Sequence, residues 1–118
     1  MTTPGHRHER IAEEIRHEIS TMLAGELKDP RIAGLVTVTE VRVSPDLRQA
    51  RVFVSVMGTE AEQASTLRGL GAASGYVRRE LTQRMGLRRG PELFWILDKS
   101  GEYSQHIEDL MRQLKKTE

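Results

Sequence analysis

The sequence predicts one α+β domain with a three-stranded mixed sheet and helices packed on one face of that sheet. Apolar residues recur at spacings of three and four near the N-terminus and again through the middle of the chain, as in amphipathic helices. Two valine-rich runs flank a turn sequence, which indicates an antiparallel hairpin. A third apolar run follows the middle helical segment, and a last helical pattern ends the chain.

The composition limits what the chain can be. With 118 residues it can bury one modest core, and we place the domain at residues 9–114 between flexible ends at 1–8 and 115–118. It has no cysteine, which excludes disulfides, thiolate metal sites and a cysteine nucleophile. No apolar run approaches the roughly 20 residues of a membrane span, and no secretory signal is apparent. We therefore expect a cytoplasmic protein without a membrane partner.

The first helix is predicted from about Arg7 to about Leu27. Its apolar face repeats at helical spacing, and the helix should stop at Lys28-Asp29-Pro30 because proline disfavours helix in the residue before it. The residues of that face are Ile11, Ile15, Ile19, Met22 and Leu23.

The hairpin is predicted from Leu35–Val43 and Arg48–Met57, joined by the turn Ser44-Pro45-Asp46-Leu47. In the first strand the valines occupy even positions up to Val38 and odd positions from Val41. A bulge near Thr39-Glu40 would explain this change in alternation. In the second strand the inward residues alternate regularly. They are Ala50, Val52, Val54 and Val56.

The middle helix should begin at a capping box, in which Thr59 and Glu62 cap each other's backbone. Its small-residue stretch from Gly71 to Gly75 predicts a kink, because glycine disfavours helix. A sharp kink would reverse the chain, so that the third strand runs parallel to the first and antiparallel to the second. The residues expected to face inward are Ala64, Leu67, Leu70, Val77, Leu81 and Met85.

The third strand is predicted at Glu92–Asp98. It is apolar on both faces, so we expect it to be covered on both faces or to lie centrally in the sheet. A C-terminal helix is predicted at Tyr103–Leu114, and its apolar residues at helical spacing are Ile107, Leu110, Met111 and Leu114.

The strongest chemical signal is a run of arginines. Between Arg68 and Arg89 there are six arginines and one acid, although the formal net charge of the whole chain is only +1. Arginine matches phosphate with a planar fork of donors, and a kink would expose helix N–H groups beside it. From the residues alone, a solvated helix face is an equally good interpretation. The candidate phosphate-binding residues are Arg78, Arg79, Arg84, Arg88 and Arg89, with Arg42, Arg48 and Arg51 of the hairpin as an extension.

Other functional classes find little support. The glycine spacing from Gly69 to Gly75 does not fit a dinucleotide-binding loop. No metal-ligand spacing occurs, and Ser104, His106 and Asp109 would be crowded on one short helix. We therefore predict no metal, no cofactor and no enzymatic activity. A protein-interaction module that uses the sheet or the acidic first helix remains the alternative.

The order of elements looks like a KH domain of the bacterial type II arrangement, α-β-β-α-kink-α-β with a C-terminal helix. From about Arg10 to about Leu114 the chain resembles the ribosome-binding factor A family. The residue blocks that carry the resemblance are Leu27–Arg31, Val36–Val41, Val43–Leu47, Ala50–Val56, Ala73–Leu81 and Pro91–Leu93. Ala73-Ser74-Gly75 matches the family's Ala-x-Gly in place of the usual KH Gly-x-x-Gly loop.

The resemblance implies a monomeric ribosome biogenesis factor. Such a factor binds the immature 30S subunit through 16S rRNA and supports late maturation and processing of that RNA, including in the cold. It also implies a ribosome-associated GTPase as a partner that acts in release. The chain departs from the family at Gly90, where a bulky apolar residue is common, and this puts the start of the third strand in question.

Overall fold

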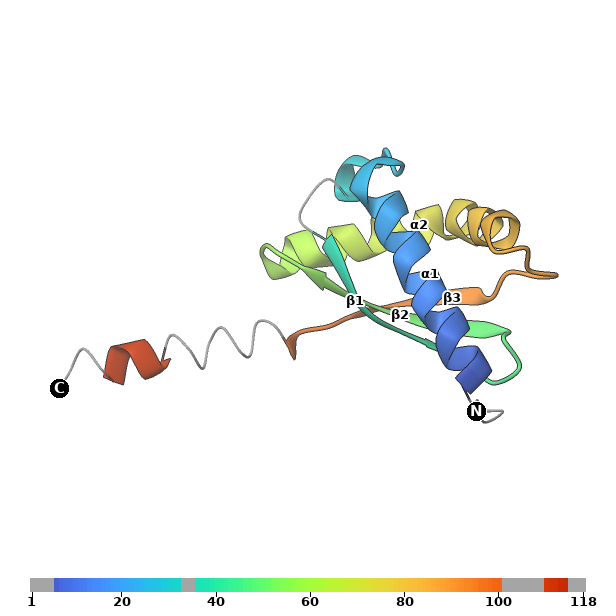
Figure 1. The fold of residues 1–118 in the computed structure, drawn as a ribbon. Coiled ribbons are helices and arrows are strands. Elements are labelled where there is room, and N and C mark those ends of the chain that lie inside the picture. Colours follow the sequence, from blue (N-terminus) through green and yellow to red (C-terminus); the bar gives the residue numbers. More distant parts are fainter. Residues whose placement is uncertain (1–5, 33–35, 101–109, 115–118) are drawn as a thin grey trace.

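The computed structural model describes residues 6–32, 36–100 and 110–114. Helix α1 and the larger helix α2 lie on one face of a single sheet whose strand order is β1-β2-β3 (Figure 1). The predicted α+β class and the mixed sheet are confirmed. The elements are α1 (His6–Gly25), the 3-10 turn η1 (Pro30–Ile32), β1 (Val36–Val43), β2 (Gln49–Val56), α2 (Glu60–Arg84) and β3 (Glu92–Leu97).

Strands β1 and β2 form the expected antiparallel hairpin, and the predicted bulge is present. The pairing register shifts between Val38 and Glu40, which leaves Thr39 as the extra residue. The hydroxyl of Thr39 lies 2.5 Å from Oδ2 of Asp98, and this hydrogen bond holds the pKa of Asp98 below its usual value. Because of the bulge, Val38 and Val41 both face the core despite their opposite parity.

Strand β3 pairs with β2 and runs parallel to it, so the predicted direction and central position of β3 are wrong. β2 is the central strand, and β3 forms an edge. Leu93, Trp95 and Leu97 of β3 pack against the core from the helix side. Phe94 lies on the opposite, open face and is 40% exposed, so the apolar residues on that face are not covered.

The direction of β3 follows from α2, which is one continuous helix. Residues 71–75 are helical, so the expected division into two helices at Ala73-Ser74-Gly75, with a reversal of the chain, is wrong. A single helix returns the chain to the end of the sheet at which β2 begins. A parallel connection from β2 to β3 requires this return. The small residues lower helix propensity, but burial of Leu70, Val77 and Leu81 against the sheet outweighs that loss.

The start of α2 confirms the capping box and corrects the inward face. The side chain of Thr59 caps the N–H of Glu62, and the Glu62 carboxylate accepts from the N–H of Thr59. Ala64, expected to face inward, is exposed. Gln63 and Thr66 are buried instead, because their side chains donate to the backbone carbonyls of Val56 and Arg31, at 3.1 and 2.9 Å. Leu67 and Met85 are half-buried.

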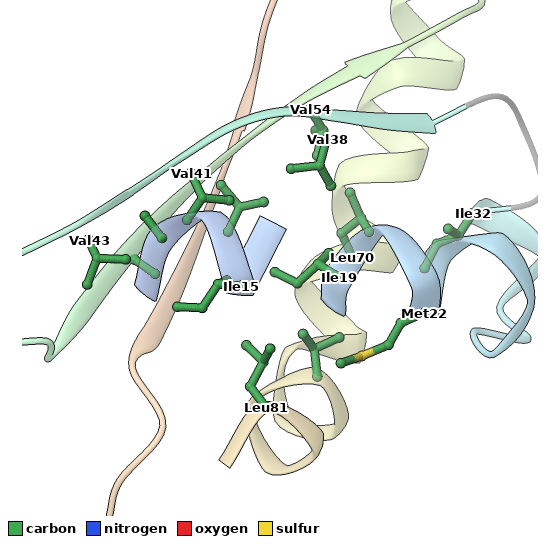
Figure 2. Packing of buried hydrophobic residues seen from close by; sticks show 14 of the residues in the cluster. Ile15, Ile19, Met22, Ile32, Val38, Val41, Val43, Val54, Leu70 and Leu81 are labelled. Atoms are coloured by element: carbon green, nitrogen blue, oxygen red, sulfur yellow. The ribbon is translucent and has the colours of Figure 1, made fainter. Parts of the chain in front are cut away.

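The core lies between the sheet and the two helices. Figure 2 shows side chains of α1 and α2 meeting beside the strands, with Ile15, Ile19 and Met22 projecting from α1. All three are fully buried, as the spacing of the first helix predicts, and Ala50, Val52, Val54 and Val56 supply the inner face of β2.

The predicted C-terminal helix is confirmed only for residues 110–114, where Leu110, Met111 and Leu114 are exposed. Its earlier part, including Ile107, lies outside the described residues, as do the chain ends at 1–5 and 115–118. The helix α1 begins at His6, ahead of the predicted domain start.

Ser74 joins α2 to β3. Its hydroxyl donates to the carbonyl of Leu70 at 3.1 Å and accepts from the indole Nε1–H of Trp95 at 2.7 Å. We expect Ser74→Ala to lower the free energy of unfolding by about 1–2 kcal/mol, because the half-buried indole loses its acceptor. Urea denaturation measures this. In a Trp95→Phe background the same substitution should have almost no effect; an equal loss in both backgrounds would contradict the role of the hydrogen bond.

Candidate nucleic-acid interface

A cleft of about 600 Å³ opens where the β1–β2 turn and the α2–β3 loop meet the first turns of α1. Two acids line it, Asp46 and Glu92. Five arginines also line it, so basic residues outnumber acids. They come from α1, from the turn, from α2 and from the loop, and they are Arg7, Arg48, Arg78, Arg88 and Arg89.

The β1–β2 turn is held rigidly at one side of the cleft. The N–H of Leu47 donates to the carbonyl of Ser44 at 2.8 Å. The Asp46 carboxylate accepts from the Ser44 hydroxyl at 2.6 Å and from the N–H of Arg48 at 3.1 Å, and these bonds lower the pKa of Asp46. The carbonyl of Arg48 then accepts from the N–H of Glu92 at 2.8 Å, which fixes the start of β3 beside the turn.

Gly90 and Arg78 form the opposite wall. Nε of Arg78 donates to the carbonyl of Gly90 at 2.9 Å. Gly90 is buried, and a β-carbon there would lie 2.9 Å from both Cγ and the carbonyl oxygen of Arg78 and still closer to Oγ1 of Thr82. The glycine therefore admits the side chain of Arg78, and β3 begins at Glu92 although the resemblance predicts a bulky apolar residue at position 90.

Arg84 lies apart from the cleft. Its Nη2 contacts the carboxylates of Glu26 at 2.6 Å and Glu80 at 3.0 Å, and its Nη1 lies 3.6 Å from Glu18. The hydrogen bond that Arg84 donates to Glu26 contributes most to raising the pKa of Arg84, followed by the one that it donates to Glu80. Three carboxylates surround this guanidinium, and their ion pairs connect α1 to α2. We therefore assign Arg84 a role in stabilising the fold.

The remaining candidate arginines lie on two other surfaces. Arg79 is exposed on α2 and does not line the cleft. Arg42 and Arg51 face each other across β1 and β2 on the open face of the sheet. Arg42 also lies over the ring of Phe53, 5.6 Å from its centre, and bonds Glu40 at 2.9 Å.

The structure thus brings together Arg78, Arg88 and Arg89 of the predicted set, and Arg48 of its extension. It adds Arg7, which carries no sequence signal of its own because it lies outside the arginine run. None of the salt bridges found within residues 6–32, 36–100 and 110–114 involves Arg7, Arg48, Arg88 or Arg89.

The described residues contain neither a metal-binding cluster nor a membrane-spanning helix. No group of three or more histidine, cysteine or acidic side chains in that part of the chain could hold a metal ion. None of its helices has the length and apolar character to cross a membrane.

Fold and cleft together define a small α+β domain with a basic cleft at one end of its sheet. The model of the family described as Ribosome-binding factor A matches residues 7–111. The ribosome-binding factor A of Acetivibrio thermocellus is 50% identical over 107 residues, 91% of this chain and 87% of that protein. The ribosome-binding factor A of Koribacter versatilis is 48% identical over 111 residues, which are 94% of this chain and 89% of that protein. The chain belongs to the ribosome-binding factor A family.

Solved structures agree with this assignment. The solution structure of a putative ribosome binding factor A from Thermotoga maritima has a TM-score of 0.71 at 30% identity and covers 85% of this chain and 94% of its own. The crystal structure of the Thermus thermophilus factor has a TM-score of 0.69 at 26% identity, with coverages of 79% and 97%. A homology model of the Thermus factor, fitted into a cryo-EM map of a 30S complex, has a TM-score of 0.61 at 27% identity and covers 75% and 91%.

Proposed function

We propose that this chain is a ribosome biogenesis factor that binds the free, immature 30S subunit through 16S rRNA. It supports late maturation and processing of that RNA, including in the cold, and it acts by binding rather than by catalysis. The membership of the family and the 30S complex of the Thermus relative support this proposal. It works in the cytoplasm as a monomer, and a ribosome-associated GTPase releases it.

The observation that carries the proposal is the convergence of arginines from separate segments on one cleft. An RNA backbone presents regularly spaced phosphates, and unpaired arginines on several segments can bind successive phosphates. Arg88 and Arg89 are the principal ligands in this scheme, because both are exposed and neither has an acidic partner in the described part of the chain. Arg7 and Arg48 extend the surface, and Arg78 shapes the loop.

The other predicted residues take different roles in this proposal. Arg79 and the pair Arg42 and Arg51 contact rRNA only where the RNA extends around the domain, because they lie outside the cleft. Gly75 lies one helical turn before Arg79 and presents no side chain there, Ala73 packs against the core, and Ser74 accepts a hydrogen bond from Trp95.

Charge reversal tests the proposal. We expect Arg88→Glu combined with Arg89→Glu to abolish co-sedimentation with precursor 30S subunits at physiological salt while the circular dichroism spectrum stays unchanged. In titrations of duplex-like 16S rRNA fragments, the slope of log affinity against log salt should fall by about 0.9 for each lost phosphate contact. The matched control is Arg10→Glu with Arg68→Glu, which makes the same change of charge at two exposed arginines outside the cleft.

The control pair should bind nearly as well as the unaltered protein. Equal loss in both double variants would mean that net charge alone governs binding. Unchanged co-sedimentation of the cleft variant would overturn the proposal. A salt-insensitive complex with a protein, without RNA affinity, would instead favour an interaction module built on the acidic surface of α1.

A further inference from the structure

We propose that the cleft captures one unstacked nucleotide of the RNA, with its base on the apolar floor and its flanking phosphates at the arginine rim. This rests on the proposed function and specifies the ligand of the same site. The cleft has a volume of about 600 Å³, which lies within the usual range of small-ligand pockets, roughly 300–1,000 Å³.

The floor of the cleft is apolar, although its rim is basic. Ile11 of α1, Leu47 of the turn and Leu87 of the loop line it and are only half-buried, so they remain open to water. Phosphate binding does not need such a floor, because phosphates require donors and positive charge. A nucleobase does, since its two faces are apolar and stack on flat apolar or aromatic surfaces.

Leucine at position 47 is unusual for the backbone conformation of the turn. Its φ is +62°, a left-handed conformation that glycine, asparagine and aspartate adopt far more readily than leucine. The turn nonetheless places leucine at this position, where its side chain packs against the core and lines the cleft at once.

The two acids and three of the arginines belong to different segments of the cleft lining. Arg7, Arg88 and Arg89 belong to α1 and to the loop and are exposed, which suits contacts with the solvated backbone of RNA. Asp46 and Glu92 also line the cleft and would repel a phosphate beside them. A carboxylate instead accepts a hydrogen bond from a base amino group, as acidic side chains do with cytosine. The base is therefore expected beside these acids and the half-buried apolar residues, and the phosphates beside the exposed arginines.

Methyl NMR of the full chain tests this directly. The protein, labelled at isoleucine and leucine methyl groups, is titrated with a single-stranded RNA hexamer and with an abasic hexamer that carries the same phosphates. We expect the complete RNA to bind about 5- to 100-fold more tightly, the effect of stacking one base. Ring currents of that base should shift the methyl signals of Ile11, Leu47 and Leu87 upfield, and the abasic hexamer should leave these signals in place.

Substitution of the floor provides the second arm. Leu47→Asn keeps a residue that tolerates the left-handed conformation but makes the floor polar, so the preference for the complete RNA should disappear while the salt dependence remains. Leu47→Met, which stays apolar, should retain most of the preference. Should Leu47→Asn not fold, Leu87→Ser alters the same floor from the loop.

The outcomes separate this inference from the proposed function. Equal binding of the two hexamers, without methyl shifts, overturns the nucleotide site and leaves phosphate-based rRNA binding intact. Methyl shifts caused by a small-subunit protein but not by RNA also overturn it, in favour of a peptide ligand. Failure of the cleft charge reversal to weaken 30S binding is the separate result that rejects the proposed function.

Discussion

Replacing Gly90 by valine is expected to lower the free energy of unfolding by about 3 kcal/mol, the upper range for overpacking a core. Its β-carbon would lie 2.9 Å from both Cγ and the carbonyl oxygen of Arg78, and closer still to Thr82, where helical backbone cannot yield easily. The hydrogen bond from Arg78 to the carbonyl of Gly90 would also be strained. Urea denaturation followed by circular dichroism measures the change.

Gly75 supplies the matched control, because no atom lies within 4 Å of the β-carbon that alanine would add there. Gly75→Ala should raise the free energy of unfolding by up to about 1 kcal/mol, as alanine is the better helix former. If Gly75→Ala instead destabilises the protein as strongly as Gly90→Val, α2 is not continuous at Gly75. That result would favour two separate helices.

Replacing Ile19 by alanine should cost about 3–4 kcal/mol of unfolding free energy, within the range for large-to-small core substitutions. Ile19 is fully buried where α1 meets α2 and the sheet, so its removal leaves a cavity that neighbouring side chains fill only in part. Chemical denaturation with a fixed m-value gives the loss.

A graded series distinguishes a cavity from a helix effect. Ile19→Val should cost about 1 kcal/mol. Leu23 lies on the same helix but is half-buried. Leu23→Ala should therefore lower the free energy of unfolding much less than Ile19→Ala does. Similar losses for Ile19→Ala and Leu23→Ala would show that α1 is not packed as described.

The sequence predicts well whatever depends on neighbours along the chain. The apolar stripe of α1, the hairpin, the bulge at Thr39 and the capping box at Thr59 are all present. Each follows from a short-range rule: a 3.6-residue period, a change of parity, or a side chain capping a backbone three residues away. The motif blocks also predict the family, which the comparison with known proteins shows.

The errors arise where distant segments decide the outcome. Two glycines lower the helix propensity of α2, but burial of Leu70, Val77 and Leu81 against the sheet keeps it a single helix where two were expected. That continuity decides the parallel pairing of β3 with β2. The apolar residues on both faces of β3 predict a covered or central strand, yet Phe94 is 40% exposed and β3 lies at the edge of the sheet.

The sequence by itself determined the local elements, the arginine-rich composition of one region and the family. Only the tertiary structure decided which arginines act together. Arg84 and Arg88 are close in sequence, but three carboxylates bind Arg84, whereas Arg88 lines the cleft. Arg7 lines the same cleft although it lies some eighty positions earlier in the chain. Charge pairing and concavity depend on through-space distances, and those are set by how α1, the turn and the α2–β3 loop meet.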